Sequence, residues 1–453
     1  MEYNDKIDKM SDLPDPLIHH IFSFLDMRLV VQTSSLSTRW RYIWASAPYL
    51  NFYLTCSGDD GVMLTPEDKI KRKCFLKFVD RVLICRDATN MQKFSLSSEI
   101  VFDGDHLHTW LIGALRRKVK ELSLQLYLLR PFELPSSIFT SEITVLSLSN
   151  YSLDGEIQLP NTFCSAARIK SLELEYIKLP GGNSDGELVL NCPVLENLSM
   201  LSCGDSHLKV LTILSPLLKK LDFASEDYYE KYSFKINIRS ANLTSFSCFC
   251  SGYPDISVVN LPSLVRADIN ISRGDEMEKD SYDDLLIGVL RGIHNVRALK
   301  LASYTLKEIT VCPNILEMLP SLFQNLRDIT VEDGGDDDDM ASISAMANVL
   351  KIQPLIKSFV WDRTKYDKGD DRGEELGVHG MFYSLKKVEI RNPHGVDDEL
   401  RFVGFLLERA IFLNEMIITT TDDDRLVSTE FVQTLLELPR SSETACVQYC
   451  VRC

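Results

Sequence analysis

The segments ITVLSLSNYSL (143–153) and IKSLELEYIKL (169–179) decide the fold, because the same order of apolar and polar residues returns along most of the chain. In each segment an apolar residue and two mostly polar ones precede an apolar–x–apolar pair. Further copies include VKELSLQL (119–126), NVRALKL (295–301), NLRDITV (325–331), SLKKVEI (384–390) and FLNEMII (412–418). The alternation within the pair predicts a short β-strand with one buried side in every copy.

The spacing of these copies indicates a repeat array. The first apolar residue of the pair falls at positions 94, 122, 146, 172, 198, 221, 246, 267, 299, 329, 359, 388 and 416. The intervals run from 21 to 32 residues, close to the period of leucine-rich repeats. One short strand can bury its apolar residues only against neighbouring repeats, so the copies must stack. A sandwich of unrelated strands, the alternative, does not explain the near-equal spacing. We therefore predict an α/β fold with an irregular leucine-rich-repeat solenoid.

A helical pattern precedes the array, in SDLPDPLIHHIFSFLDMRLVVQTSSLSTRWRYIWASAPYLNF (11–52). Apolar residues at three- and four-residue spacing predict a first amphipathic helix through Leu17, Ile18, Ile21, Phe22 and Leu25. A second short helix follows through Val31, and a third sets Trp40 and Trp44 one turn apart. Three helices of this size bury little area and are marginal alone. They form either a cap that packs on the next domain or a module that binds a partner.

The same stretch carries anchors at fixed offsets, which are Leu13-Pro14-Asp15, Ile21 to Leu25, Thr33-Ser34, Leu36-Ser37, Arg39-Trp40-Arg41 and Trp44. With these anchors it resembles the F-box. Two more resemblances follow in order. FVDRVL (78–83), at the end of an amphipathic helix predicted over residues 67–86, leads to KFSL (93–96) as in plant proteins with F-box, leucine-rich-repeat and FBD regions. Residues 385–420 and 431–442 resemble the FBD region of that family.

The resemblance implies the substrate-recognition adaptor of an SCF-type (Skp–cullin–F-box) E3 ubiquitin ligase. Such an adaptor is not an enzyme. Its F-box docks on a Skp-type linker, the linker joins a cullin, and the repeat array binds an unknown protein target. The resemblance implies that the linker-binding anchors are Leu13, Pro14, Leu17, Ile18, Ile21 and Leu25. Four more residues either join that surface or hold the helices together: Val31, Leu36, Trp40 and Trp44.

Two positions depart from the family's usual pattern. Asp26 stands where a proline is usual, and Leu29 where an acidic residue is usual. Both changes alter a surface turn and leave the apolar anchors in place. Two other functions stay open: a small-molecule-sensing F-box receptor, and a repeat scaffold that is not engaged in a ligase.

The composition of the chain limits the classes of partner and the cellular compartments that we expect. The net charge is −16, and this argues against nucleic acid or an anionic membrane as the main partner. The N-terminus shows no signal peptide, and no apolar stretch approaches the length of a membrane span. The 12 cysteines are scattered, as expected in a reducing compartment. We expect the cytoplasm or the nucleus.

No pattern of catalytic, metal-ligating or phosphate-binding residues stands out, so no cofactor is predicted. The acidic stretch EDGGDDDD (332–339) lacks the spacing of a calcium loop. Cys446, Cys450 and Cys453 lack a fourth zinc ligand and are assigned to a tail. The predicted organisation is a disordered N-terminus (1–10), F-box (11–52), linker and amphipathic helix (53–89), solenoid (90–380), FBD-like repeats (381–442) and flexible tail (443–453).

Overall fold

The computed structural model describes residues 13–36, 38–56, 65–101, 104–151, 155–225, 234–252, 255–258, 261–273, 279–333, 343–363, 380–421 and 428–452. The predicted disordered N-terminus, most of the acidic stretch 332–339, and Cys453 lie outside these ranges. The chain forms two compact units, of which the first is Met1–Leu218 with Tyr229–Phe234, and the second is Lys219–Tyr228 with Lys235–Cys453. Within the described residues, no helix combines the length and apolar character needed to cross a membrane.

The first unit opens with a module of short helices, α1 (Asp15–Phe22), α2 (Met27–Gln32), η1 (Thr33–Ser35), α3 (Trp40–Ile43) and η2 (Trp44–Ser46). Pro14 precedes α1, where a missing amide donor costs nothing. The helices close on a small core of Ile18, Phe22, Met27, Val30, Trp40 and Ile43. The three predicted helices are thus present, and single 3₁₀ turns extend the second and third.

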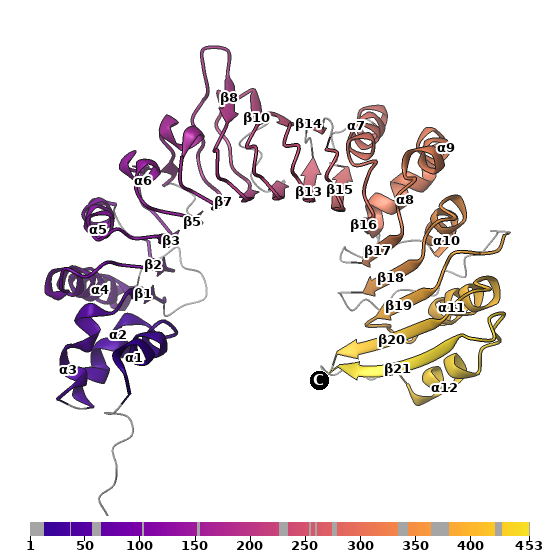
Figure 1. Cartoon of the computed structure of the whole chain (residues 1–453), viewed down its shortest axis with the longest axis horizontal. Helices are drawn as coiled ribbons and strands as arrows, with labels where there is room; N and C mark the ends of the chain where they lie inside the picture. Colours follow the sequence, from indigo (N-terminus) through magenta and orange to yellow (C-terminus); the bar gives the residue numbers. More distant parts are fainter. Residues whose placement is uncertain are drawn as a thin grey trace, which may run out of the picture. The chain divides into compact units, whose positions relative to one another are not determined.

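The first unit continues as parallel strands, each paired with the next: β1 (Tyr49–Leu54), β2 (Lys93–Ser98), β3 (Glu121–Leu126), β5 (Val145–Asn150), β7 (Ser171–Glu175) and β9 (Asn197–Leu201). Matching leucines face one another across the register, as in Leu124 opposite Leu148 and Leu148 opposite Leu174. Figure 1 shows α4 (Pro66–Cys85), α5 (Asp105–Arg116) and α6 (Ser137–Thr140) on one side of these strands. The buried leucines face that side.

Some connections in the first unit use short strands. β4 (Phe132–Glu133) pairs with β6 (Ile157–Gln158), and β8 (Glu187–Leu190) pairs with β10 (Val210–Ile213). The connection from β5 to β7 contains η3 (Asn161–Ser165) as well as β6. Helical and extended connections differ in length, and this difference explains the uneven intervals of the sequence pattern.

The second unit repeats the arrangement with β11 (Lys220–Ser225), β13 (Ser245–Gly252), β15 (Arg266–Arg273), β16 (Ala298–Ala302), β17 (Asp328–Asp333), β18 (Ser358–Arg363), β19 (Lys387–Arg391), β20 (Glu415–Thr421) and β21 (Cys446–Arg452). β12 (Lys235–Ile238) pairs with β14 (Asp255–Val258). The later connections are the helices α7 (Lys279–Gly292), α8 (Ser303–Val311), α9 (Pro313–Leu322), α10 (Ile343–Ile352), α11 (Asp397–Arg409) and α12 (Thr429–Glu437), which share one side of the strands (Figure 1).

The predicted fold class is confirmed: N-terminal helices precede a parallel-strand leucine-rich-repeat sheet. Every position predicted to begin an apolar pair lies on a strand and is buried, from Phe94 on β2 to Met416 on β20. Two boundaries need correction. β1 crosses the predicted boundary between residues 52 and 53. Residues 446–452 form β21, which pairs with β20 and is not a flexible tail.

Candidate functional site

Exposed apolar side chains on the N-terminal module form the candidate binding surface. Leu17 and Ile21 lie one turn apart on α1 with 51% and 39% of their surface exposed, whereas Ile18 and Phe22 are buried. The module also exposes three more large apolar side chains, which are Phe24, Leu29 and Leu36. Apolar surface that a small fold leaves in water favours binding to another protein. Together with Pro14, the five exposed side chains are called the apolar docking set.

The predicted linker-binding residues divide by burial. The exposed ones are Pro14, Leu17, Ile21 and Leu36, and the partly buried ones are Leu13, Leu25, Val31 and Trp44. Ile18 and Trp40 are buried, and the Trp40 ring meets Phe22 edge to face at 5.8 Å. Ile18 and Trp40 therefore belong to the module's core, which corrects the assignment of Ile18 as a surface anchor. One residue along a helix turns the side chain by about 100°, so Leu17 and Ile18 face different sides.

Three exposed residues were missing from the prediction. Phe24, Leu29 and Tyr42 have 75%, 51% and 73% of their surface in solvent. Phe24 follows Ile21 by three residues, and this spacing was the available signal in the sequence. Leu29 belongs to the apolar pattern that predicts the second helix, and it departs from the usual acidic residue at that position.

Asp26 fastens the module to the repeat array. One oxygen of Asp26 accepts the backbone N–H of Arg28 at 2.7 Å and caps α2. The other oxygen accepts the N–H of Tyr53 on β1 at 3.0 Å. The Asn51 amide, also on β1, donates to the carbonyl of Ser23 at 3.0 Å. Asp26, described above as a change in a surface turn, thus joins the turn after α1 to the first strand.

A buried arginine makes a second connection. The Arg86 guanidinium, at the end of α4, donates to the carbonyl of Ala47 and, at 3.3 Å, to that of Asn90. Burial lowers the pKa of Arg86 to about 10, and the neighbouring Asp87 opposes that shift. Arg86 therefore keeps its charge at neutral pH. Its hydrogen bonds hold the end of the module against the base of β2.

Replacing Asp26 with alanine should destabilise the junction between α2 and β1. Losing the helix cap costs about 1 kcal/mol, and the lost hydrogen bond to the Tyr53 N–H removes up to about 1 kcal/mol more. We expect the free energy of opening, measured by hydrogen exchange of the α2 and β1 amides, to fall by up to about 2 kcal/mol. Asp15→Ala is the matched control, because its ion pair with Arg39 is exposed and contributes little. Equal losses in the two variants would contradict the fastening role of Asp26.

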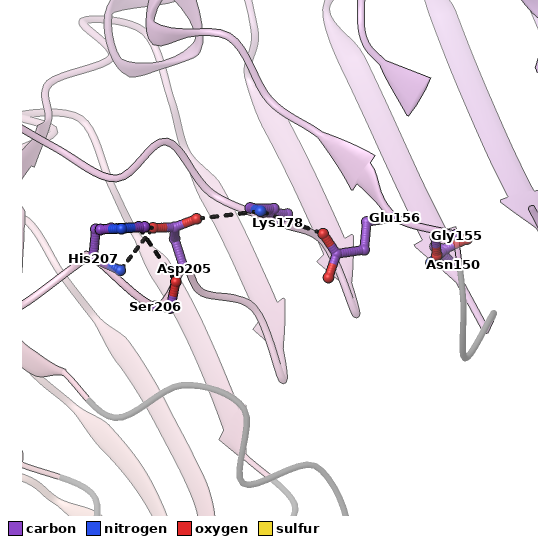
Figure 2. A network of polar contacts seen from close by, with 7 residues as sticks. All are labelled: Asn150, Gly155, Glu156, Lys178, Asp205, Ser206 and His207. Carbon is purple, nitrogen blue, oxygen red and sulfur yellow. Dashed lines mark hydrogen bonds and ion pairs between the residues drawn. The ribbon is translucent and has the colours of Figure 1, made fainter. Parts of the chain in front are cut away.

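A polar network lies at the turns after β5, β7 and β9, all in the first unit (Figure 2). The Lys178 ammonium is 3.4 Å from a Glu156 oxygen and 3.6 Å from an Asp205 oxygen. The buried Asp205 also accepts the backbone N–H of His207 at 2.8 Å. Glu156, Lys178 and Asp205 come from three successive repeats, so their contacts tie neighbouring repeats together.

The network contains a serine, a histidine and an aspartate, but its geometry is not that of a nucleophilic triad. Asp205 and Ser206 approach the same ring nitrogen of His207, Nδ1, at 3.1 and 3.3 Å. A triad needs the carboxylate on one nitrogen and the hydroxyl on the other, so that the ring can take the hydroxyl proton. The network is therefore structural. Across the described ranges, no group of three or more His, Cys, Asp or Glu side chains is placed to hold a metal ion.

Both the N-terminal module and the repeat array match known protein families. Residues 10–51 match the family described as "F-box domain". Residues 83–430 match the family described as "At1g61320/AtMIF1, LRR domain", which spans well over half of the chain. The first match covers the module that carries the apolar docking set, and the second runs from the end of α4 into α12.

The curated relatives combine the same two parts. The chain is 31% identical to the "Putative F-box/FBD/LRR-repeat protein At3g59240" of Arabidopsis thaliana over 366 residues, covering 78% of this chain and 68% of the relative. It is 26% identical to the "F-box/LRR-repeat protein At3g59200" of the same plant, covering 97% and 87%. A third relative, "Putative F-box protein At1g58310", is 29% identical over 80% of this chain and 74% of its own. The helical module, the parallel repeat strands and these matches agree, and the chain belongs to the plant F-box/LRR-repeat family.

Proposed function

We propose that this protein is the substrate-recognition adaptor of an SCF-type E3 ubiquitin ligase. The observation that carries the proposal is the exposure of Leu17 and Ile21 on a folded F-box helix. Two neighbouring apolar side chains on one helix face suit the helix-in-groove mode of recognition, with a Skp-type linker supplying the groove. The linker would join a cullin, and the repeat array would hold the target protein.

The attachment of the F-box to β1 supports this role. Hydrogen bonds of Asp26 and Asn51 connect the F-box to β1. Arg86, at the end of α4, donates to the carbonyl of Ala47 at the end of the F-box helices. A target held by the first repeats would then keep a fixed position relative to the linker. Such positioning raises the effective concentration of a target lysine near the ubiquitin thioester. The adaptor itself makes and breaks no bond, and we place its work in the cytoplasm, the nucleus or both.

Co-purification tests the proposal. The tagged chain of residues 1–453, co-expressed with a plant Skp-type linker, should elute with it as a complex of equal stoichiometry, measured by light scattering. Addition of a cullin should give a single larger complex that retains both proteins. A folded chain that elutes alone in the presence of micromolar linker would refute the adaptor role.

A further inference from the structure

Three tyrosines form a ladder on the first unit. Each tyrosine directly follows the last residue of a strand: Tyr127 follows β3, Tyr151 follows β5 and Tyr176 follows β7. The ring centroids of Tyr127 and Tyr151 are 5.7 Å apart, and those of Tyr151 and Tyr176 are 5.6 Å apart. All three side chains are half-buried, so part of each ring meets solvent. Tyr176 has a φ of 55°, a backbone conformation that a tyrosine rarely adopts.

The Tyr151 hydroxyl donates to Glu175, which alternates along β7 with the buried Leu172 and Leu174. Glu175 therefore points to the side of the strands opposite the helices α4, α5 and α6 (Figure 1), which we call the open face. Along each strand, alternate residues point to this face. In the two rows beyond the first residue of each strand from β2 to β9, most are short and polar, namely Ser95, Ser97, Ser123, Gln125, Ser147, Ser149 and Ser199. In these rows the charged residues are Glu173 and Glu175 on β7, whereas the row at the strand starts carries Lys93 opposite Glu121. A floor of small side chains beside a tyrosine edge leaves room for a partner's side chains.

Neither carboxylate is neutralised by a cation in the described residues. Glu173 accepts the Ser147 hydroxyl at 2.9 Å, and Glu175 accepts the Tyr151 hydroxyl at 2.7 Å. Burial, followed by the hydrogen bond to Glu175, raises the pKa of Tyr151 to about 12. The Tyr151 hydroxyl therefore stays protonated as a donor. This bond holds the Glu175 carboxylate beside the ring edges of the ladder.

We infer that Tyr127, Tyr151, Tyr176, Glu173 and Glu175 form a subsite for an arginine or lysine side chain of a basic protein segment. The face of a tyrosine ring attracts a cation, and a carboxylate beside it adds a charge-assisted hydrogen bond. Arginine fits best, because its planar guanidinium can stack on a ring and donate to a carboxylate at once. The inference rests on the proposed function, since the basic segment would belong to the target protein.

Charge complementarity selects this occupant. Nucleic acid would need clustered cations on the open face, and the charged residues beside the ladder are the carboxylates Glu173 and Glu175. An apolar segment would leave Glu173 and Glu175 without water and without a countercharge, at a large cost in free energy. A basic segment satisfies both carboxylates and uses the ring faces. The subsite thus makes the repeat array prefer target proteins that carry a basic segment.

Peptide binding to the full chain tests the subsite. The probe is a labelled seven-residue glycine–serine peptide with two arginines, compared by fluorescence anisotropy with the same peptide carrying neutral citrulline. Wild type should prefer the arginine peptide at least about fivefold. The double variant Glu173→Gln with Glu175→Gln keeps the hydrogen-bond acceptors for Ser147 and Tyr151 but removes both charges. It should weaken arginine-peptide binding about tenfold and flatten its salt dependence.

The tyrosine contribution is tested by comparing two substitutions at one position. Tyr151→Ala removes the ring and should weaken binding about fivefold, whereas Tyr151→Phe keeps the ring and should weaken it much less. Tyr383→Ala is the matched control, because Tyr383 is a highly exposed tyrosine in the second unit. Its binding should equal that of wild type.

A charge control completes the test. Glu317→Gln with Glu437→Gln removes two exposed carboxylates from α9 and α12 and should leave binding unchanged. Equal weakening by this pair would show general attraction to an acidic protein and overturn the subsite. A wild type that does not distinguish arginine from citrulline would overturn it as well. Binding of the wild-type chain to a Skp-type linker is measured in parallel. If the wild-type chain does not bind the linker, the adaptor role is refuted, whatever the peptide results.

Discussion

Replacing Leu17 and Ile21 together with alanine should weaken the affinity for a Skp-type linker by roughly a thousandfold. Each side chain presents its exposed surface on α1, and burying one aliphatic side chain of this size contributes about 2 kcal/mol. Two such losses, near the centre of an interface where a few apolar anchors dominate, raise the dissociation constant by about three powers of ten. Titration calorimetry of the purified chain with the linker measures the change directly.

The matched control truncates two isoleucines on a neighbouring helix. Ile70 and Ile84 on α4 are 65% and 80% exposed but lie outside the F-box. Ile70→Ala with Ile84→Ala should leave the linker affinity within about twofold of wild type. Both double variants should remain folded, because the buried core of Ile18, Phe22 and Trp40 is unchanged in each. Wild-type linker affinity in the Leu17→Ala, Ile21→Ala variant would move the docking surface elsewhere.

The strands of the array could be predicted because a strand with one buried side has apolar residues at alternate positions of the sequence. On β5, Leu146 and Leu148 are fully buried, and they alternate with the polar residues Ser147 and Ser149. β21 shows what such a pattern misses. Its residues from Cys446 to Val451 are exposed or half-buried, and its order comes from backbone pairing with β20. Backbone hydrogen bonds do not depend on side-chain polarity, so an edge strand of this kind leaves no apolar signal.

The candidate docking surface could be located to one helix but not to one side of it. α1 is apolar on two sides, with Ile18 and Phe22 facing the core and Leu17 and Ile21 facing solvent. Periodicity identifies the helix, yet it does not say which apolar side meets the rest of the module. The choice depends on α3, whose Trp40 covers Phe22. Contacts of this range are absent from any local pattern.

The same limit applies to a buried ion-pair cluster in the second unit. Arg363, the last residue of β18, binds Glu399 of α11, and the two residues are 36 positions apart. Only 3% of the Arg363 side chain and 1% of the Glu399 side chain are exposed. The Arg363 guanidinium lies 5.0 Å from the centre of the Trp361 ring, and the Trp361 N–H donates to Asp333 at 2.6 Å. The cluster fastens α11, in the region predicted to be FBD-like, to strands β17 and β18.

Glu399 also organises the turn that leads into its own helix. Its two oxygens accept the backbone N–H groups of His394 and Gly395, both at 2.8 Å, and that of Val396 at 3.2 Å. These donors directly precede the first turn of α11, so the carboxylate holds the segment that leads into the helix. One carboxylate thus neutralises a buried cation and closes the start of a helix. Removing the Glu399 carboxylate therefore removes both the ion pair with Arg363 and the hydrogen bonds at the start of α11.

Glu399→Ala should therefore lower the local stability of the β18–α11 region by about 3 kcal/mol, because the buried Arg363 loses its close ion pair and keeps Asp333 at 3.8 Å. Hydrogen exchange of peptides covering β18 and β19 measures this loss as faster opening. The double variant Arg363→Met with Glu399→Ala should recover part of it, since the buried cation that lost its close ion pair is then removed. Glu415→Gln is the control, because its pair with Lys387 is about two-fifths exposed, and its loss should cost less than about 1 kcal/mol. If Arg363→Met gave no recovery, the loss would come from the turn at His394–Val396 and not from the buried charge.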